Sequence, residues 1–366
     1  MTPPRWNDYY INTDFESFWK DRLSDSERRV CMIIGVGFDP RSLVALEGLA
    51  RSGNPSQISF VALMLPTSPA VTEYSQRVEQ LTQLNRKRLE SFTGGTCIYK
   101  EEVPIRDEDG HPVGARKSVQ VINDLFLQIS QHSDVIVDIS GLPRSFFFPV
   151  IKFLFQKAEA NAIRNLHVAV TEDPAIDGKI RGREYGDADY IQHFRPQQQQ
   201  RLVWLPVISK SEGTRLSKIH SQLESECVEI CPIIPFPTKN IRRPDDLLIN
   251  LREELFERIF VSQENILLCD ERTPFDLYRK IVEMDSYYRE RLRDLPGIGE
   301  ITTVVSPLAN KMLSLGVLLA AIDRELPVSY VEAGSYDIEN EHMELSVEKD
   351  DIIPVEIWIA GEPYEE

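Results

Sequence analysis

The residues best suited to chemistry lie in the segment 35–42, GVGFDPRS, which directly follows an apolar run. Its glycines, Gly37 among them, let the backbone approach another group closely. Asp39 is placed to cap a helix, and the proline after it suits the first helical position. Arg41 then falls in the first helical turn, where its positive charge opposes the helix dipole. A basic residue at this unfavourable position indicates an anion that it binds.

A second segment, DISGLPRS, has the same arrangement. Asp138 ends an apolar strand, Ser140 begins a turn with free amides, and Arg144 follows a proline in the first turn of the next helix. A doubly wound sheet would place the two preceding strands side by side, so we predict that Arg41 and Arg144 bind one anion. In the alternative interpretation, Asp39 and Asp138 cap their helices and pair with the two arginines.

Two turns in the second half of the chain carry the same residue types. KSEGTR contains Lys210 and Arg215, and SPLANK contains Ser306 and Lys311. In parallel α/β sheets, ligands gather at the carboxyl ends of the strands, where the following helices present free N–H groups. We therefore predict a phosphate-sized anion site formed from Gly37, Asp39, Arg41, Asp138, Ser140, Arg144, Arg215, Ser306 and Lys311.

The elements that must position these turns follow from hydrophobic periodicity. Apolar runs of strand length alternate with amphipathic stretches of helix length, which is typical of parallel strands covered by helices. The predicted strands are 28–36, 58–66, 134–140, 165–171, 201–209, 228–237, 265–271, 300–307 and 327–334. The main predicted helices are 42–51, 70–92, 117–131, 144–160 and 245–260, with two more ending near 293 and 324. Residues 94–114 predict a charged hairpin or loop.

The same order of elements runs twice, which predicts an α/β protein of two tandem Rossmann-like lobes with parallel sheets. The predicted parts are an N-terminal extension 1–27, a lobe 28–177, a polar linker 178–200, a lobe 201–337 and an acidic C-terminal segment 338–366 with a late strand. Overlaying the halves places Arg41 on Arg215. This favours a degenerate internal duplication with the strand ends of the lobes near one another; two unrelated α/β domains are the alternative.

Several common nucleotide sites do not match the sequence. The first glycine turn lacks the third glycine of the dinucleotide fingerprint, and the second strand ends in Met64, Leu65 and Pro66 without an acid for a ribose. The same ending argues against an S-adenosylmethionine site, although IIGVGFDPRS looks like the opening loop of some methyltransferases. The sequence contains no P-loop, G-x-S-x-G or H-E-x-x-H motif. We assign no cofactor and no catalytic residue.

The overall charge limits the partners. The chain has 41 basic and 58 acidic side chains and a net charge of −17, which disfavours extended nucleic-acid binding. A small anionic ligand stays compatible with this charge, because a few arginines and helix N-termini make a pocket locally positive. A protein partner is also expected.

Cysteines, histidines and hydropathy give no further site. The five cysteines are widely spaced, so we expect free core thiols and no zinc site. Among the histidines only His167 falls in a predicted strand, where we expect a core residue. No apolar run reaches the roughly 20 residues of a membrane span, and the first residues do not form a secretory signal, so we expect a cytoplasmic protein.

The order of elements, together with GFDPRS and DISGLPR, resembles the CARF and SAVED group of Rossmann-like sensors in prokaryotic antiviral defence. The resemblance covers roughly residues 28–336. It implies binding of a nucleotide second messenger between two Rossmann-like units. The sequence carries no signature of an attached nuclease or protease.

Three function classes follow from these residues. The first is a sensor or regulatory subunit that binds a nucleotide or another phosphorylated small molecule in a cleft between the lobes. The second is a nucleotide-processing hydrolase or nucleosidase in which Asp39 or Asp138 activates water or stabilises a cation. The third is a non-catalytic scaffold whose acidic surface engages a basic partner.

Overall fold

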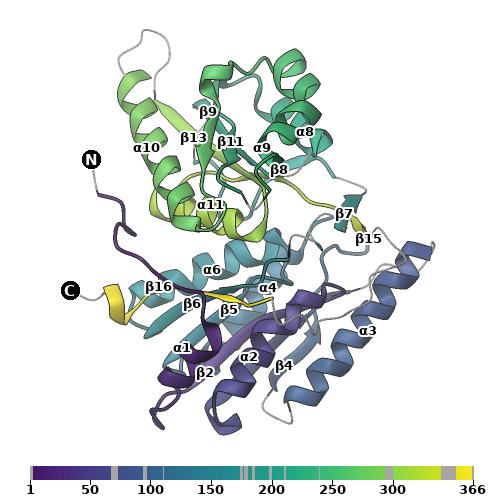
Figure 1. The fold of residues 1–366 in the computed structure, drawn as a ribbon, viewed down its shortest axis with the longest axis vertical. Coiled ribbons are helices and arrows are strands. Elements are labelled where there is room, and N and C mark those ends of the chain that lie inside the picture. The colour runs from purple at the N-terminus through teal and green to yellow at the C-terminus, as the bar shows by residue number, and fades with distance from the viewer. Residues whose placement is uncertain are drawn as a thin grey trace. The chain divides into compact units, whose positions relative to one another are not determined.

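The chain folds into two units, each built around its own sheet (Figure 1). The computed structural model describes residues 3–66, 73–93, 97–109, 111–173, 176, 180–183, 186–197, 200–209, 212–238, 240–292, 300–338 and 352–364. The seven-stranded unit comprises Asp8–Arg183 and Ser335–Glu366. The five-stranded unit comprises Met1–Asn7 and Glu184–Gly334.

The seven-stranded unit has the strand order β1-β16-β6-β5-β2-β3-β4. Its strands are β1 (Tyr10–Asn12), β2 (Val30–Val36), β3 (Ile58–Met64), β4 (Cys97–Glu102), β5 (Asp134–Asp138), β6 (Asn165–Val170) and β16 (Val355–Ala360). β2 to β6 are mutually parallel, whereas β16 is antiparallel to both β6 and β1. Every residue of β2 is buried, as expected for a central strand covered on both faces.

Helices cover both faces of this sheet. They are α1 (Phe15–Arg22), the 3-10 helix η1 (Pro40–Leu43), α2 (Val44–Ser52), α3 (Glu73–Thr93), α4 (Gly114–Asp124), α5 (Phe126–Ile129) and α6 (Arg144–Glu159). In Figure 1, α1, α2 and α3 lie on one face, and α4 and α6 lie on the other. On the first face, Phe15 and Trp19 pack with Met32 and Ile34 in one apolar cluster. This is the arrangement that right-handed crossovers produce.

The N- and C-terminal segments belong to the seven-stranded sheet. The sequence placed residues 8–27 in an extension, but they form β1 and α1, and α1 contributes Phe15 and Trp19 to the core. The late strand predicted near residues 352–359 is present as β16, and it pairs with β6. Residues 339–351 lie outside the described part of the chain.

Three strands occur in stretches that were predicted as a charged hairpin or loop (94–114) and as a polar linker (178–200). The charged stretch 94–114 contains β4, which pairs in parallel with β3 at the sheet edge. The polar stretch before β9 contains β7 (Ile180–Arg183) and β8 (Ala188–Tyr190). β7 pairs with β15 (Ser335–Ile338), so the two segments that join the units are hydrogen-bonded to each other, with Arg183 opposite Ser335.

The five-stranded unit contains a parallel sheet centred on β9. Its strands are β9 (Arg201–Ile208), β10 (Cys227–Ile230), β11 (Ile233–Pro235), β12 (Leu267–Cys269) and β13 (Ile301–Leu308). β10 and β11 share one edge of β9, β13 lies along its other edge, and β12 pairs with β11. Its helices are α8 (Gly213–Leu223), α9 (Arg243–Asn250), the π-helix η3 (Glu253–Arg258), α10 (Pro274–Leu292) and α11 (Lys311–Asp323).

The two units share one strand order. β10 and β11 are counted here as one strand, because both pair with the same edge of β9. In each unit the first strand (β2 or β9) is then central. The second and third strands (β3 and β4, or β10–β11 and β12) lie on one side of it, and the fourth (β5 or β13) lies on the other. The fifth strand lies beside the fourth in both units. In the seven-stranded unit, β6 pairs with β5. In the five-stranded unit, β14 (Ser329–Val331) lies next to β13, to which the chain is joined by the bridge of Val328 with Val305. An antiparallel strand then closes each series, β16 or β8. The protein is therefore an α/β protein whose two parallel sheets have the Rossmann order.

The length and hydropathy of the helices bear on whether any of them could cross a membrane. In the part of the chain that the structure describes, no helix combines the length and the apolar character needed to cross a membrane.

Candidate functional site

The strand order of the seven-stranded unit reverses at β2 and β5. β2 has β3 on one side and β5 on the other, and Ile34 of β2 lies opposite Asp138 at the end of β5. The connections after these strands lead to helices on opposite faces, α2 and α6 (Figure 1). In open α/β sheets the crevice for a ligand lies outside the carboxyl ends of the strands at such a point.

The two turns at this point are packed directly against each other. A Cβ atom on Gly141 would lie 2.4 Å from the Gly35 carbonyl oxygen and 2.5 Å from Ser42 Cβ. A Cβ atom on Gly35 would lie 2.5 Å from Leu142 Cδ2. Gly35 and Gly141 therefore allow the close approach of the two turns. This approach was predicted for the glycines of the first motif. We call residues 35–42 and 138–145 the switch-point turns.

The first switch-point turn satisfies its own polar groups. Arg41 donates from Nε to Asp39 Oδ1 at 2.9 Å and from Nη2 to Asp39 Oδ2 at 2.7 Å, and its side chain is only 5% exposed. The Asp39 carboxylate also accepts the Arg41 amide, and Ser42 Oγ donates to the Asp39 carbonyl at 2.7 Å. The predicted helix cap is present, and the alternative Asp39–Arg41 pairing is the geometry observed.

A residue that the sequence did not single out holds this turn in place. Asn85 of α3 is 1% exposed, and its Nδ2 donates to the carbonyls of Gly37 at 2.8 Å and Asp39 at 3.0 Å. Burial of both partners explains why an amide is needed here, because an unpaired buried carbonyl is costly. No local pattern marks Asn85, since its partners lie 48 and 46 positions away.

The second switch-point turn combines an acid with hydroxyl groups. Asp138 Oδ1 accepts hydrogen bonds from both the amide and the hydroxyl of Ser140. Ser140 Oγ in turn accepts the Thr171 amide at 2.8 Å, which joins the ends of β5 and β6. All three residues are at most 1% exposed. Thr171 Oγ1 is buried and has no hydrogen-bond partner among the described residues.

Helix α6 begins directly after this turn. Arg144 is its first residue and is partly exposed, as predicted for a first-turn arginine. Pro143 occupies the cap position, and no side chain caps the helix. Ser145 Oγ is buried without a hydrogen-bond partner among the described residues. The start of this 16-residue helix therefore offers a positive dipole end, an arginine and a hydroxyl group.

The geometry does not support one anion bound by both Arg41 and Arg144. Their strands are neighbours, as predicted. The helices that follow lie on opposite faces of the sheet, however, and Arg41 is folded onto Asp39 (Figure 1). Of the two arginines, we retain Arg144 as the candidate ligand contact.

In the five-stranded unit, the first-turn arginine is also paired internally. Arg215 in α8 is 4% exposed, bonds Glu212 Oε2 at 2.8 Å and lies 5.3 Å from the ring centre of Tyr330. A Cβ atom on Gly213 would meet the Glu254 carboxyl group at 2.8 Å. The start of α8 is thus surrounded by the protein's own carboxylates, which disfavours an anion there. Lys210 lies outside the described residues.

The second predicted turn of this unit, SPLANK, begins one residue later than expected, because β13 ends at Leu308. Ser306 is inside β13, fully buried, and accepts a hydrogen bond from Trp204 Nε1 at 2.9 Å. The predicted strand 300–307 is confirmed with an end one residue later, because β13 continues through Pro307 to Leu308. Asn310 caps α11 instead, accepting the Leu313 amide, and Lys311 is the first helical residue as predicted.

A polar cluster surrounds the turn between β13 and α11. Ser209 Oγ accepts the Asn310 amide at 2.9 Å, and the Ser209 carbonyl accepts Arg243 Nη2 at 3.1 Å. Arg243 also pairs with Glu271 at 2.5 Å. Glu271 therefore joins a polar cluster, while Thr273 Oγ1 accepts the Phe275 amide at the start of α10. Each of these contacts pairs protein groups with one another.

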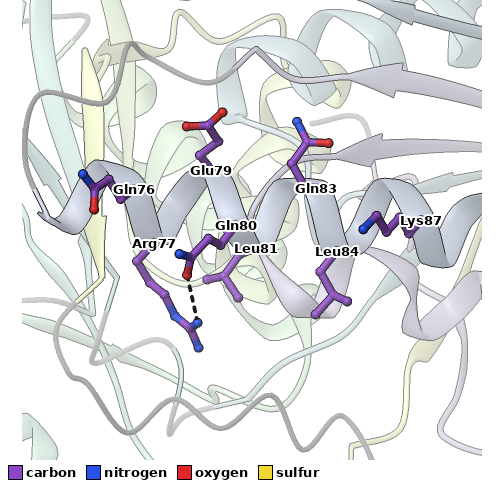
Figure 2. A pocket seen from close by; sticks show the side chains of 8 residues that line it. All are labelled: Gln76, Arg77, Glu79, Gln80, Leu81, Gln83, Leu84 and Lys87. Atoms are coloured by element: carbon purple, nitrogen blue, oxygen red, sulfur yellow. Dashed lines mark hydrogen bonds between the residues drawn. The ribbon is translucent and has the colours of Figure 1, made fainter.

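A pocket of about 600 Å³ lies on α3, and all the described residues that line it belong to that helix. In Figure 2, Glu79 and Gln83 point to one side of the helix, whereas Arg77 and Leu84 point to the other. Arg77 Nη1 donates to Gln80 Oε1 at 3.4 Å. Side chains that diverge around one helix do not build a binding site, and none of the nine predicted ligand residues lines this pocket.

One group of possible metal ligands occurs among the described residues. Asp107, Asp109 and His111 place their ligand atoms within 4.8 Å of one another, and all three side chains are exposed. Asp107 Oδ1 accepts the amides of Asp109 and His111, which is how an aspartate closes a turn. We assign the cluster to the turn.

Comparisons of the chain with known proteins do not assign it to a family. No family model and no curated protein match the chain. A Pseudomonas aeruginosa UCBPP-PA14 protein assigned as a universal stress protein is 9% identical and matches 82% of this chain and 92% of its own at a TM-score of 0.23. The UDP-GlcNAc 2-epimerase of Neisseria meningitidis, bound to UDP-GlcNAc, is 10% identical and matches 80% of this chain and 86% of its own at 0.22. At such TM-scores these likenesses carry no argument about ligand or mechanism.

Proposed function

We propose that the seven-stranded unit binds a nucleotide or another phosphorylated small molecule at the switch-point turns, and that the protein is a sensor or regulatory subunit. One observation carries this proposal. Two glycine turns meet where the strand order reverses, beside the uncapped start of the long helix α6. Free amides at a helix start and a close backbone approach are what phosphate groups need.

The groups available for the ligand differ in their roles. The first amides of α6 and the Arg144 guanidinium would bind the phosphate by charge-assisted hydrogen bonds. Ser145 Oγ and Thr171 Oγ1, two hydroxyl groups with no hydrogen-bond partner in the described part of the chain, supply further donors and acceptors. Asp138 and Ser140 hold the second turn in shape.

Binding without turnover is favoured over hydrolysis by the state of Asp39. Both of its carboxylate oxygens accept hydrogen bonds from Arg41. A carboxylate held in this way is a poor general base for water. The resemblance to CARF and SAVED sensors narrows the proposed ligand class to nucleotide second messengers and the proposed setting to antiviral defence.

The test combines a nucleotide panel with two variants. Thermal shift reports binding, and mass spectrometry of the nucleotides reports turnover. With the nucleotide that shifts the wild-type melting temperature, Arg144→Ala should weaken binding by about 1.5–3 kcal/mol, the loss of one charge-assisted hydrogen bond. The control is Arg51→Ala, because Arg51 is 56% exposed and forms an ion pair with Glu16, which is also half exposed. This control should bind like wild type.

Each other outcome contradicts a part of the proposal. Unchanged affinity in Arg144→Ala, with weaker binding in Lys311→Ala, would move the site to the five-stranded unit. Conversion of a nucleotide would favour the hydrolase, with Asp138 as the acid to test. No shift and no conversion with any nucleotide would favour the scaffold.

A further inference from the structure

A histidine at the other end of the seven-stranded sheet is completely enclosed. His167 of β6 is 0% exposed. Its Nδ1 lies 2.6 Å from Glu356 Oε1 of β16, and its Nε2 lies 3.1 Å from Asp134 Oδ1 of β5. With a carboxylate at each ring nitrogen, both nitrogens act as donors only if the ring is protonated. The contacts therefore fit an imidazolium.

The positive and negative charges of the buried side chains around His167 cancel only when its ring is protonated. Arg22 Nε bonds Asp134 at 2.6 Å, and Arg28 lies 3.5 Å from the same carboxylate. Both arginines also pair with Glu362. The buried and half-buried charged groups around His167 are Arg22 (α1), Arg28 (before β2), Asp134 (β5), Glu356 (β16) and Glu362 (after β16). Asp25 lies 3.9 Å from Arg28, but its side chain is 56% exposed and screened by water. Arg164 also reaches Glu362, but its side chain is 62% exposed and screened by water.

Aromatic rings exclude water from this cluster. The rings of Trp19, Phe18 and Trp358 have centres 5.1, 6.2 and 4.7 Å from that of His167. Arg22 lies over Trp358, 4.2 Å from the ring centre. Loss of the proton would leave one uncompensated negative charge in a site from which water is excluded, and a buried unpaired charge is expensive.

We propose that Asp134, His167 and Glu356 form a proton-dependent latch that holds the C-terminal strand β16 on the sheet. With the proton on His167 the latch is closed. Loss of the proton leaves Glu356 facing Asp134 across a neutral ring, and β16 separates from β6. β1 then loses its partner as well, because it pairs with β16.

The direction of the pH dependence follows from the proton count. Burial alone lowers the pKa of His167, but the charge of Glu356 and the hydrogen bonds to both carboxylates outweigh it, so the pKa is raised. Burial would raise the pKa of Asp134, yet its bond to His167 and the charges of His167 and Arg22 lower it. The latch is thus fully closed below the ordinary histidine value of about 6.5 and is lost as the pH rises through the raised value.

The experiment is hydrogen exchange of the full chain between pH 6 and 9, corrected for intrinsic exchange. Opening of β16 releases one proton, so its opening constant should rise about tenfold per pH unit above 6.5 until the raised pKa is reached. Peptides from β3 should show no such slope. His167→Gln should exchange quickly in β16 at every pH. The control is His111→Gln, since His111 is 73% exposed in the same unit and should keep the wild-type slope.

If the His167→Gln variant does not fold, measurements on the wild-type chain still test the proposed latch. Nuclear magnetic resonance of labelled histidine side chains should show one imidazolium that persists well above pH 6.5. A His167 ring that is neutral at pH 7, β16 exchange without a pH slope, or a His167→Gln slope equal to wild type would each overturn the latch.

Discussion

Arg41 and Arg215 occupy equivalent places in their units, and the structure gives both the same partner type. Each follows the first strand, each is about 5% exposed, and each pairs with an acid two or three residues earlier, Asp39 or Glu212. The positive charge that opposes the helix dipole is therefore compensated within the turn. At the residue scale these two arginines therefore stabilise the turns in which they lie.

This role predicts a loss of stability in Arg41→Ala. The change removes a buried bidentate partner and leaves the Asp39 carboxylate, only 14% exposed, without its cation. We expect a decrease of about 2–3 kcal/mol in the free energy of unfolding, somewhat below the range for a fully buried pair. Urea unfolding followed by circular dichroism measures it.

The matched comparison is again Arg51→Ala. Its pair with Glu16 is about half exposed on both sides, so its loss should change the free energy of unfolding by less than about 1 kcal/mol. Equal stability of the two variants would mean that the Asp39–Arg41 pair does not stabilise the turn.

At the element scale, the close contact between the switch-point turns is the feature most sensitive to size. Gly141 has no room for a methyl group, because a backbone oxygen and Ser42 lie within 2.5 Å of the added atom. A Cβ atom on Gly37, by contrast, would meet only the flexible side chain of Leu65, at 3.3 Å. The two glycines share a motif type but differ in their surroundings.

We therefore expect Gly141→Ala to lower the free energy of unfolding by roughly 1–3 kcal/mol, the usual range for overpacking, and by more than Gly37→Ala. Gly37→Ala should cost less than about 1 kcal/mol, since Leu65 can move. Thermal unfolding of both variants under one condition makes the comparison. A neutral Gly141→Ala would show that the turns separate easily.

The central strands and most of the helices were predictable because burial on two faces leaves continuous apolar runs, as in β2. β4 was missed because an edge strand needs no such run: its last residues, KEE, are exposed. β7 and β8 were missed because they are short and pair with β15 and β14, far away in the sequence. Ser306 was predicted to be a ligand contact because it lies near a strand end, but its hydroxyl bonds Trp204 inside the sheet, a partner 102 positions away.

The candidate site was predictable to the level of its turns but not of its contacts. The sequence identified the two glycine segments and the neighbouring strands that carry them. It left open whether the Arg41 side chain binds a ligand or pairs with Asp39. A separation of two residues is compatible with either contact. It gave no sign of Asn85 or Thr171, whose partners come from other elements.

At the scale of the whole molecule, the two units have one strand order but unequal switch points. In the seven-stranded unit the fourth strand is followed by a helix without a cap, whereas in the five-stranded unit Asn310 caps the equivalent helix. The start of α8 is further crowded by Glu254 against Gly213. The two units thus share a strand order but differ at the helix start that follows the fourth strand.

The pairing of β7 with β15 makes the five-stranded unit an insertion. Residues 184–334 leave the seven-stranded unit after Arg183 and return at Ser335, and these two residues face each other in an antiparallel pair. Their Cα atoms are then about 5 Å apart, a gap that a two-residue Asn-Gly hairpin turn spans. Replacing residues 184–334 by such a turn would remove the five-stranded unit except for residues 1–7. β7 and β15 would then form an ordinary β-hairpin.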